Sequence, residues 1–440
     1  MEPGLVLLIG EGQLADATAR ALESGGAEVS RLDEPGDSEI RDALTDRVGR
    51  VIVISRFDHV SLRRALVVAH VRPGIQQLVT IFDRDVAAHL QESVENVSVL
   101  SMADAVTPAF AGPCLDPQLI SLIRGSGGVE GIGASNGEPA RVPRSWSVPS
   151  RWQRARSMLE SLARPFDASA AILVYGFLGF SAVVIVETAA TMLVEGYSFV
   201  DAFYTVAKVT VTVGPSEAAD QGSDWFKLFS AVTILLTLGF AAVLTAGVVN
   251  RLLDPRLTGI FGRSAVPRRD HVVVVGLGQV GFRLCELFRD LGVPVVAIEV
   301  NPDAKNVPRA KDLQLPVVIG SGASQRLLRR LSIRRARALA AVTSDEVENI
   351  AVAVAARGLR DDLNIALRAG DGDATSETQS LFRIGVTRDV YRLAGTALAA
   401  VALGHGANEA FPLEGTIHLV GDENRIEPFA DREPSQVPVD

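Results

Sequence analysis

Cysteine is scarce in this 440-residue chain, which contains only Cys114 and Cys285. Two cysteines so far apart in the sequence make neither a disulfide framework nor a four-ligand zinc site. We expect both to be small buried apolar residues of a protein in a reducing cytoplasm. Positive charge is also in deficit, because 43 lysines and arginines stand against 52 acidic residues and leave a net charge of −9. This balance argues against a long basic groove, so nucleic acid is not an expected partner.

The common catalytic motifs are missing as well. The sequence has no HExxH, no GxSxG and no cluster of cysteine and histidine. Its six histidines are scattered, and we expect each of them to be structural. We therefore predict no catalytic residue and no metal site, and we do not expect an enzyme.

Two long stretches without any charged residue are present in a chain whose mean hydropathy is +0.24. Residues 168–186 form a run of 19, and residues 228–250 form a run of 23. A helix needs about 20 apolar residues to cross the hydrocarbon core of a bilayer. We predict two membrane spans in contact with lipid, over 168–194 and 228–250. The alternative is a pair of buried core helices in a large soluble domain.

The charges around these runs predict the orientation of the chain. Arginines are concentrated before the first run and after the second, whereas the segment between the runs is acidic. Because positive charge stays on the cytoplasmic side, we expect both termini in the cytoplasm and the chain in the inner cell membrane. Residues 151–166 place Trp152 and four further apolar residues at helical spacing among arginines. This pattern predicts an amphipathic helix on the inner membrane surface, with an ordinary cytoplasmic helix as the alternative.

A dinucleotide-binding fingerprint follows the second run. A buried strand over 271–275 leads into Gly276, Gly278 and Gly281 in the pattern G-x-G-x-x-G, with Gln279 and Val280 at the start of a helix. A second strand, over 294–298, ends at Glu299, which we expect to accept hydrogen bonds from ribose hydroxyls. The pattern predicts binding of NAD(H) or an adenine nucleotide, with its diphosphate at the helix N-terminus. The alternative is a Rossmann-like fold that has lost its ligand.

The N-terminus repeats this pattern in a shorter form. A strand over 5–9 is followed by Gly10, Gly12, Ala15 and later Asp33, and both Gly10 to Gly276 and Asp33 to Glu299 are offset by 266 residues. The equal offsets predict an internal repeat. One strand–helix unit of the C-terminal half, over 316–331, has no N-terminal counterpart, so we expect the N-terminal nucleotide site to be the weaker one. Alternating strands and helices predict parallel sheets with helices on both faces.

These patterns predict a multi-domain chain. Residues 1–124 are expected to form a shortened Rossmann-like domain and residues 268–410 a complete one. Residues 125–150 are rich in glycine and serine and predict a flexible linker. Residues 151–255 would form the membrane domain, and residues 411–440 a tail that is disordered from Glu427 onward.

The loop between the spans, over 198–217, predicts a re-entrant segment. Asp201–Val209 has helical spacing, an extended Thr210–Gly214 follows, and Pro215 comes next. Irregular backbone at membrane depth is tolerated only where protein or water covers it. Four copies around an axis would present rings of carbonyl oxygens to an ion. A plain extracellular loop is the alternative.

This loop resembles the pore loop of two-span potassium channels. The resemblance rests on Asp-Ala-Phe-Tyr at 201–204 and on Thr212, Val213 and Gly214, which match the start of the usual filter Thr-Val-Gly-Tyr-Gly-Asp. The flanking halves resemble RCK domains, also called TrkA-N domains. The resemblance implies two α/β RCK domains around an all-α two-span pore module. It also implies a homotetramer that conducts cations, with K⁺ as the expected ion, and a cytoplasmic ring that opens the pore on binding nucleotides or divalent ions.

The sequence departs from the family filter in ways that bear on selectivity. Pro215 stands where tyrosine is usual, and Ser216 stands where the second glycine is usual. Lys208 occupies a position at which some potassium channels have a glutamate that bonds an acid at the outer end of the filter. Glu217 lies at that outer end, so we hypothesise a Lys208–Glu217 ion pair behind the filter. The alternative is a Lys208 side chain that faces the ion path and repels cations.

Gly239 lies at the middle of the second predicted span. It is a candidate gating hinge because glycine weakens a helix interior. Close helix packing by a small residue is the alternative. For the whole chain, the alternatives to a regulated channel are a non-conducting membrane-anchored nucleotide sensor and a membrane-bound NAD-linked oxidoreductase.

Overall fold

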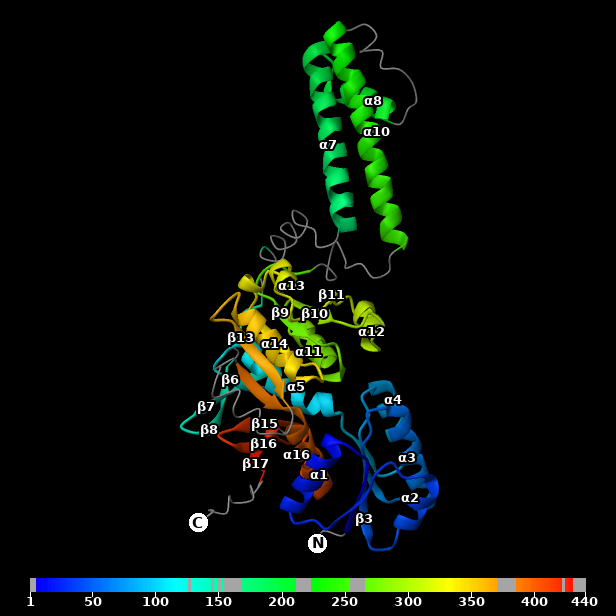
Figure 1. The fold of residues 1–440 in the computed structure, drawn as a ribbon, viewed down its shortest axis with the longest axis vertical. Coiled ribbons are helices and arrows are strands. Elements are labelled where there is room, and N and C mark those ends of the chain that lie inside the picture. Colours follow the sequence, from blue (N-terminus) through cyan, green and yellow to red (C-terminus); the bar gives the residue numbers. More distant parts are fainter. Residues whose placement is uncertain are drawn as a thin grey trace. The chain divides into compact units, whose positions relative to one another are not determined.

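The structure is a computed structural model that divides into two compact units, residues 1–152 with 267–440 and residues 153–266. It describes residues 5–125, 128–143, 146–148, 150, 152, 168–210, 223–253, 266–369, 385–421 and 424–429 (Figure 1). Within the interfacial helix predicted over 151–166, only Trp152 belongs to the described residues.

The N-terminal half of the first unit is a five-stranded parallel sheet in the order β2-β1-β3-β4-β5. Its strands are β1 Leu5–Ile9, β2 Val29–Leu32, β3 Val48–Val53, β4 Gln76–Val79 and β5 Val97–Val99. Its helices are α1 Gln13–Ser24, α2 Asp37–Ala43, α3 Asp58–Val71 and α4 Arg84–Ser93. Successive residues of β1 pack into two different hydrophobic clusters. Val6 belongs to the cluster that includes residues of α1, and Leu7 belongs to the cluster that includes residues of α2, α3 and α4. Burial on both faces explains the uninterrupted apolar run of this strand.

The C-terminal half is a six-stranded parallel sheet in the order β11-β10-β9-β12-β13-β14. Its strands are β9 Val272–Val275, β10 Val295–Glu299, β11 Val317–Ile319, β12 Ala338–Ala341, β13 Asn364–Ala369 and β14 Val386–Asp389. Its helices are α11 Gln279–Asp290, α12 Asn306–Asp312, α13 Gln325–Arg330 and α14 Glu346–Arg357, with a short 3₁₀ turn at Ile333–Arg335.

The predicted internal repeat is confirmed by strand register. Val6 pairs with Val29 in one sheet and Val272 pairs with Val295 in the other, and each position is offset by 266 residues. The predicted absence of one strand–helix unit from the N-terminal half is confirmed too. Strand β11 flanks β10, whereas the equivalent β2 is the edge strand of the sheet within residues 5–125.

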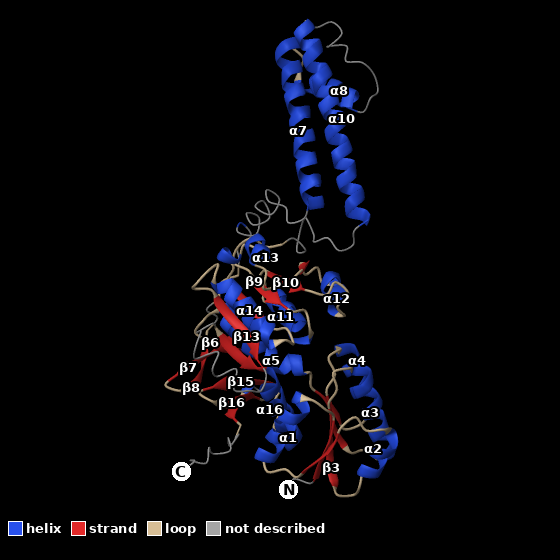
Figure 2. Cartoon of the chain, in the orientation of Figure 1, coloured by secondary structure: helices blue, strands red, loops and turns tan. Residues whose placement is uncertain are grey.

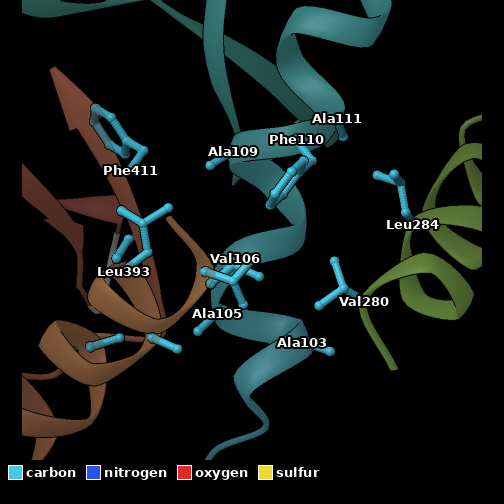
Figure 3. Close-up of a cluster of buried hydrophobic side chains, with 14 of the residues drawn as sticks. Ala103, Ala105, Val106, Ala109, Phe110, Ala111, Val280, Leu284, Leu393 and Phe411 are labelled. Atoms are coloured by element: carbon cyan, nitrogen blue, oxygen red, sulfur yellow. The ribbon is translucent and has the colours of Figure 1, made fainter. Parts of the chain in front are cut away.

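The two halves exchange their last helices. Helix α5, Met102–Leu115, follows the N-terminal sheet but packs on α11, and helix α16, Val390–Leu403, follows the C-terminal sheet but packs on α1. One hydrophobic core therefore combines side chains of both halves, such as Phe110, Leu284 and Leu393 (Figure 3). Burial of this continuous core makes the two halves one folding unit.

The prediction of a flexible linker over 125–150 was wrong for residues 128–142. Strands β6 Leu119–Gly125, β7 Gly128–Ser135 and β8 Glu138–Val142 form an antiparallel sheet. The glycines have structural roles here. A Cβ at Gly131 would lie 2.5 Å from the side chain of Leu119. Asn136 and Gly137 both have positive φ, at 54° and 80°, as a tight hairpin turn requires.

The predicted tail was also wrong over much of its length. Strands β15 Glu409–Leu413, β16 Thr416–Val420 and β17 Ile426–Pro428 form a second antiparallel sheet. The start of the predicted disorder, at Glu427, therefore lies in a strand. Residues 430–440 lie outside the described residues.

The second unit contains α7 Ala168–Glu195, α8 Phe199–Thr210 and α10 Asp224–Leu253, which are drawn as helices in Figure 2. Helices α7 and α10 pack along each other, and α8 contacts both. Two segments, Ile172–Glu195 and Asp224–Val249, are long and apolar enough to cross a membrane. Only 22% and 17% of their most apolar windows are buried, so their apolar side chains mostly face outward, unlike those of a soluble core helix.

Small residues allow α7 and α10 to approach, but Gly239 is not one of them. A Cβ at Gly179 would lie 2.2 Å from the ring of Phe240, and a Cβ at Gly247 would lie 3.1 Å from the backbone of Leu173. A Cβ at Gly239 would meet nothing within 4 Å, so the described residues do not bear out the packing alternative for this glycine. Helix α10 runs through Gly239 without interruption, and its role as a hinge stays a prediction.

Candidate functional site

The three glycines of the C-terminal fingerprint have three different structural roles. Gly276 ends β9 with φ 92°, and a Cβ there would lie 2.9 Å from the backbone of Thr343. A Cβ at Gly281 would lie 1.9 Å from the carbonyl oxygen of Gly276, so this glycine lets α11 pack against the strand. Gly278 has open space around its Cβ position, and it is the N-cap of α11. The geometry matches the tight turn, the open approach and the close packing expected of this motif.

The N-terminus of α11 has no side-chain cap. Gly278 lacks a side chain, and its carbonyl oxygen accepts the hydrogen bond from Phe282 N–H at 2.9 Å. The first-turn N–H groups and the positive end of the helix dipole are therefore available to an anion. A diphosphate is the chemical group that such a terminus binds in this fold.

Glu299 lies at the end of β10 and is held beside the glycine loop. One carboxylate oxygen accepts a hydrogen bond from Leu277 N–H at 2.8 Å, and the other accepts one from Asn301 N–H at 3.0 Å. An ionised carboxylate has about four acceptor positions, so both oxygens can still accept a hydroxyl. The amide of Asn306 donates to the Leu277 carbonyl at 3.0 Å and holds the loop from its other side. The sequence analysis did not identify Asn306.

A cavity of about 850 Å³ opens beside these groups. Its C-terminal wall includes Gly276, Gly278, Gln279, Val280 and Glu299, so it brings together every predicted residue of this half except Gly281. The volume is in the usual range for small-molecule sites.

Two lining residues of the cavity were missed in the sequence. Arg368, in β13, donates to the hydroxyl of Tyr391 at 2.8 Å, and its guanidinium lies 5.1 Å from the centre of that ring. Tyr391 belongs to α16 and comes 23 residues after Arg368 in the chain. No short motif connects two residues so far apart, so the sequence offered no local signal for the pair.

The N-terminal repeat does not form an equivalent site. Of Gly10, Gly12, Ala15 and Asp33, only Gly12 lines the cavity. Asp33 instead pairs with Arg31, whose Nε lies 2.6 Å from its carboxylate. Gly12 has φ 79° where Gly278 has φ −67°, so the two loops differ in conformation. Ala15 carries a Cβ at the position equivalent to Gly281, where the C-terminal loop has no room for one.

Glu11 is a further difference that sequence reasoning missed. This residue stands between the two N-terminal glycines and lines the cavity. A hydrogen bond with Glu34 raises the pKa of the Glu11 carboxyl, with burial and the charge of Glu34 acting in the same direction. Acidic groups in the loop oppose the binding of a diphosphate there. The weaker N-terminal nucleotide site stays a prediction.

The predicted pore segment is described only in part. Helix α8 begins where the hydroxyl of Ser198 donates to Asp201 at 2.6 Å and accepts from its N–H at 3.3 Å, which is a capping arrangement. The predicted helix over Asp201–Val209 is confirmed, but Thr210 was expected to be extended and is the last helical residue. The ammonium of Lys208 lies 5.5 Å from the centre of the Tyr204 ring.

The predicted filter residues lie outside the described residues. These are Thr212, Val213, Gly214, Pro215 and Ser216, and Glu217 is also outside. The proposed Lys208–Glu217 ion pair and the re-entrant path therefore stay predictions.

Comparison with known proteins identifies the class of the C-terminal half. Residues 272–391 match the family model of the TrkA-N domain. The range begins at β9 and ends just inside α16, so it covers the glycine loop, Glu299 and the C-terminal wall of the cavity. This half therefore carries a TrkA-N domain.

Several relatives of the chain are named as potassium channel proteins, and others as K(+) efflux antiporters. "Potassium channel protein 1" of Methanocaldococcus jannaschii is 24% identical over 235 residues, which are 52% of this chain and 69% of that protein. "Voltage-gated potassium channel Kch" of Escherichia coli is 23% identical over 220 residues, which are 47% of this chain and 51% of that protein. The chain is thus a potassium-channel-like protein with a TrkA-N domain. The match to the solved structure "GsuK channel bound to NAD" covers 91% of this chain and 64% of that chain, at 13% identity and a TM-score of 0.48.

Proposed function

We propose that the chain is the subunit of a nucleotide-regulated cation channel with K⁺ as the permeant ion. The observation that carries this proposal is the presence in one chain of a short helix packed on two apolar helices and of an uncapped glycine loop that opens into a cavity. The relatives named as potassium channels support the same function. A homotetramer in the inner cell membrane, with lipid around its apolar helices and both chain ends in the cytoplasm, is the expected assembly.

Helix α8 has the length and position of a pore helix. It ends at Thr210, two residues before Thr212. The negative end of a helix dipole favours cations within the last turn and just beyond it. Four copies around an axis would place four such ends around one ion path. Lys208 lies in that last turn and opposes the field, so its charge bears directly on conduction.

The C-terminal cavity is the expected regulatory site. Its open helix terminus and Glu299 fit NAD(H) or an adenine nucleotide without a 2′-phosphate. We propose that the nucleotide is a regulatory ligand and that the chain performs no reaction on it. Regulation requires that the ligand bind two conformations of the protein with different affinity.

The decisive experiment is cation flux from liposomes that contain the purified full chain. Potassium and sodium flux are compared with and without NAD, NADH, ADP and ATP. Two matched variants locate the site, because Glu299→Gln alters the C-terminal half and Asp33→Asn alters the equivalent position of the N-terminal half. We expect potassium flux that a nucleotide changes in the wild type and in Asp33→Asn but much less in Glu299→Gln.

Other outcomes contradict parts of the proposal. Equal potassium and sodium flux would retain a channel and remove potassium selectivity. Absence of flux under every nucleotide, in folded and tetrameric protein, would favour the non-conducting sensor. Turnover of the cofactor with a candidate substrate would favour an NAD-linked oxidoreductase.

A further inference from the structure

The cavity beside the glycine loop has a second wall, which the N-terminal half supplies. This wall includes Gly12, Arg56, Phe57 and Phe82. A ligand held by the C-terminal loop would therefore contact side chains from the other half of the same chain.

The two halves are held together at the edge of the cavity. The ring of Phe82 lies 6.1 Å from the ring of Phe282 in an edge-to-face arrangement. The guanidinium of Arg283 lies 4.5 Å from the centre of the Phe82 ring. Arg309, in α12, forms an ion pair with Asp83. Helix α11 follows the glycine loop, and helix α12 follows Glu299. The elements that would hold the nucleotide therefore also contact Phe82 and Asp83 of the N-terminal half.

Arg56 is close in sequence to a residue that holds Phe82 and Asp83. Two residues later, the carboxylate of Asp58 accepts hydrogen bonds from the N–H groups of Phe82 and Asp83, both at 3.1 Å. Arg56 itself is exposed, and the structure records no ion pair for it among the described residues. Its charge is therefore available to a ligand in the cavity.

The cavity has other charged lining residues, which include Lys305, Glu348 and Arg368 of the C-terminal half. Asp58 and Glu299 are both occupied with backbone N–H groups. The acid nearest to the N-terminal glycines is Glu11, whose charge would oppose a phosphate at that loop rather than at the C-terminal one. Strand register places Arg56 at the position equivalent to Ser344, so this position carries a positive charge in the N-terminal half and none in the C-terminal half.

We propose that Arg56 binds a phosphate group of the nucleotide that the C-terminal loop holds, so that the ligand links the two halves. The proposal rests on the nucleotide site of the proposed function. It adds a phosphate-binding residue from the half whose own glycine loop is predicted to be the weaker nucleotide site. Arginine suits this task because its planar guanidinium donates two parallel hydrogen bonds to phosphate oxygens.

The test is a calorimetric titration of the purified full chain with ADP and with adenosine. The variants are Arg56→Ala, Arg56→Lys and a matched control, Arg41→Ala, which removes an exposed arginine of α2 that does not line the cavity. For Arg56→Ala we expect about tenfold or greater loss of ADP affinity, corresponding to one charge-assisted hydrogen bond, and unchanged adenosine affinity. Arg56→Lys should recover part of the loss, and Arg41→Ala should bind both ligands like the wild type.

Two results would overturn the proposal while leaving the nucleotide site in place. One is wild-type ADP affinity in Arg56→Ala, and the other is an equal loss of ADP and adenosine, which would indicate a structural role. A wild-type chain that binds neither ligand would refute the nucleotide site itself and this proposal with it. Thermal unfolding of each variant shows whether a loss of binding reflects a loss of fold.

Discussion

Replacement of Gly281 by alanine separates the packing role of the glycine loop from its binding role. The new Cβ would lie 1.9 Å from the Gly276 carbonyl oxygen and 3.2 Å from a methyl group of Val342. The close atom is backbone, so α11 must move away from β9. That helix carries Leu284 and Phe288 in the shared core, and both are buried. Overpacking of this kind costs about 1–3 kcal/mol.

Gly278→Ala is the matched control, and it should have the opposite effects. No atom lies within 4 Å of its Cβ position, and its φ of −67° suits any residue. We expect unchanged stability or a gain of about 0.4–1 kcal/mol. Its methyl group would instead occupy the space through which a phosphate approaches the helix terminus, so nucleotide affinity should fall.

Thermal unfolding and ADP titration of both variants give the two readouts. Gly281→Ala should unfold at a temperature a few degrees lower, and Gly278→Ala should unfold like the wild type but bind ADP poorly. A wild-type unfolding temperature in Gly281→Ala, or a larger destabilisation in Gly278→Ala, would refute the assignment of roles.

Three further predictions concern single side chains. Burial lowers the pKa of His271 from 6.5 to about 4, so its contribution to stability is present above pH 6.5 and is lost as the pH falls toward 4, by up to about 3 kcal/mol. Unfolding temperatures between pH 7.5 and 4.5 should fall less steeply in His271→Gln, and equal slopes would contradict this. Arg283→Met should cost about 3 kcal/mol in urea unfolding because it removes a buried guanidinium that pairs with the largely buried Glu286, whereas Arg289→Met, which breaks a partly exposed pair with Asp290, should cost under about 1 kcal/mol. Glu187 is buried against α10 in the membrane unit. A buried polar residue in a membrane helix is often functional, so Glu187→Leu should reduce cation flux and Glu187→Gln should preserve it. Equal flux in the two variants would contradict a polar role.

Local patterns were sufficient for the elements that the sequence analysis predicted correctly. The 266-residue offset between Gly10 and Gly276 anticipated strand register, because register in a buried parallel sheet follows the apolar strand and its glycine turn. The absence of charge over 168–186 anticipated α7, because length and hydropathy suffice to indicate a membrane helix. The burial of Cys114 and Cys285 is confirmed, and burial raises the pKa of the Cys114 thiol to about 12.

Local sequence patterns could not predict the exchange of helices α5 and α16 between the two halves. Nearly every residue of α5 is buried, so it shows no amphipathic period, and Pro108 and Pro113 lie inside it. A helix that is apolar on all sides needs neighbours on all sides, and here they come from both halves. The sheet over 128–142 was missed for a related reason, since glycine content was taken as flexibility when Asn136 and Gly137 form a hairpin turn.

The exchange gives the N-terminal half a structural role that does not depend on its own glycine loop. Removing this half would take α5 from the buried face of α11 and would expose the face of α16 that packs on α1. The α16–α1 contact is close, because a Cβ at Gly395 would lie 2.8 Å from the backbone of Ala17. Each half completes the core of the other, so we expect the TrkA-N half to be less stable when the N-terminal half is removed. Both halves line the cavity, so a nucleotide bound there as proposed would contact the two halves at once and would link them.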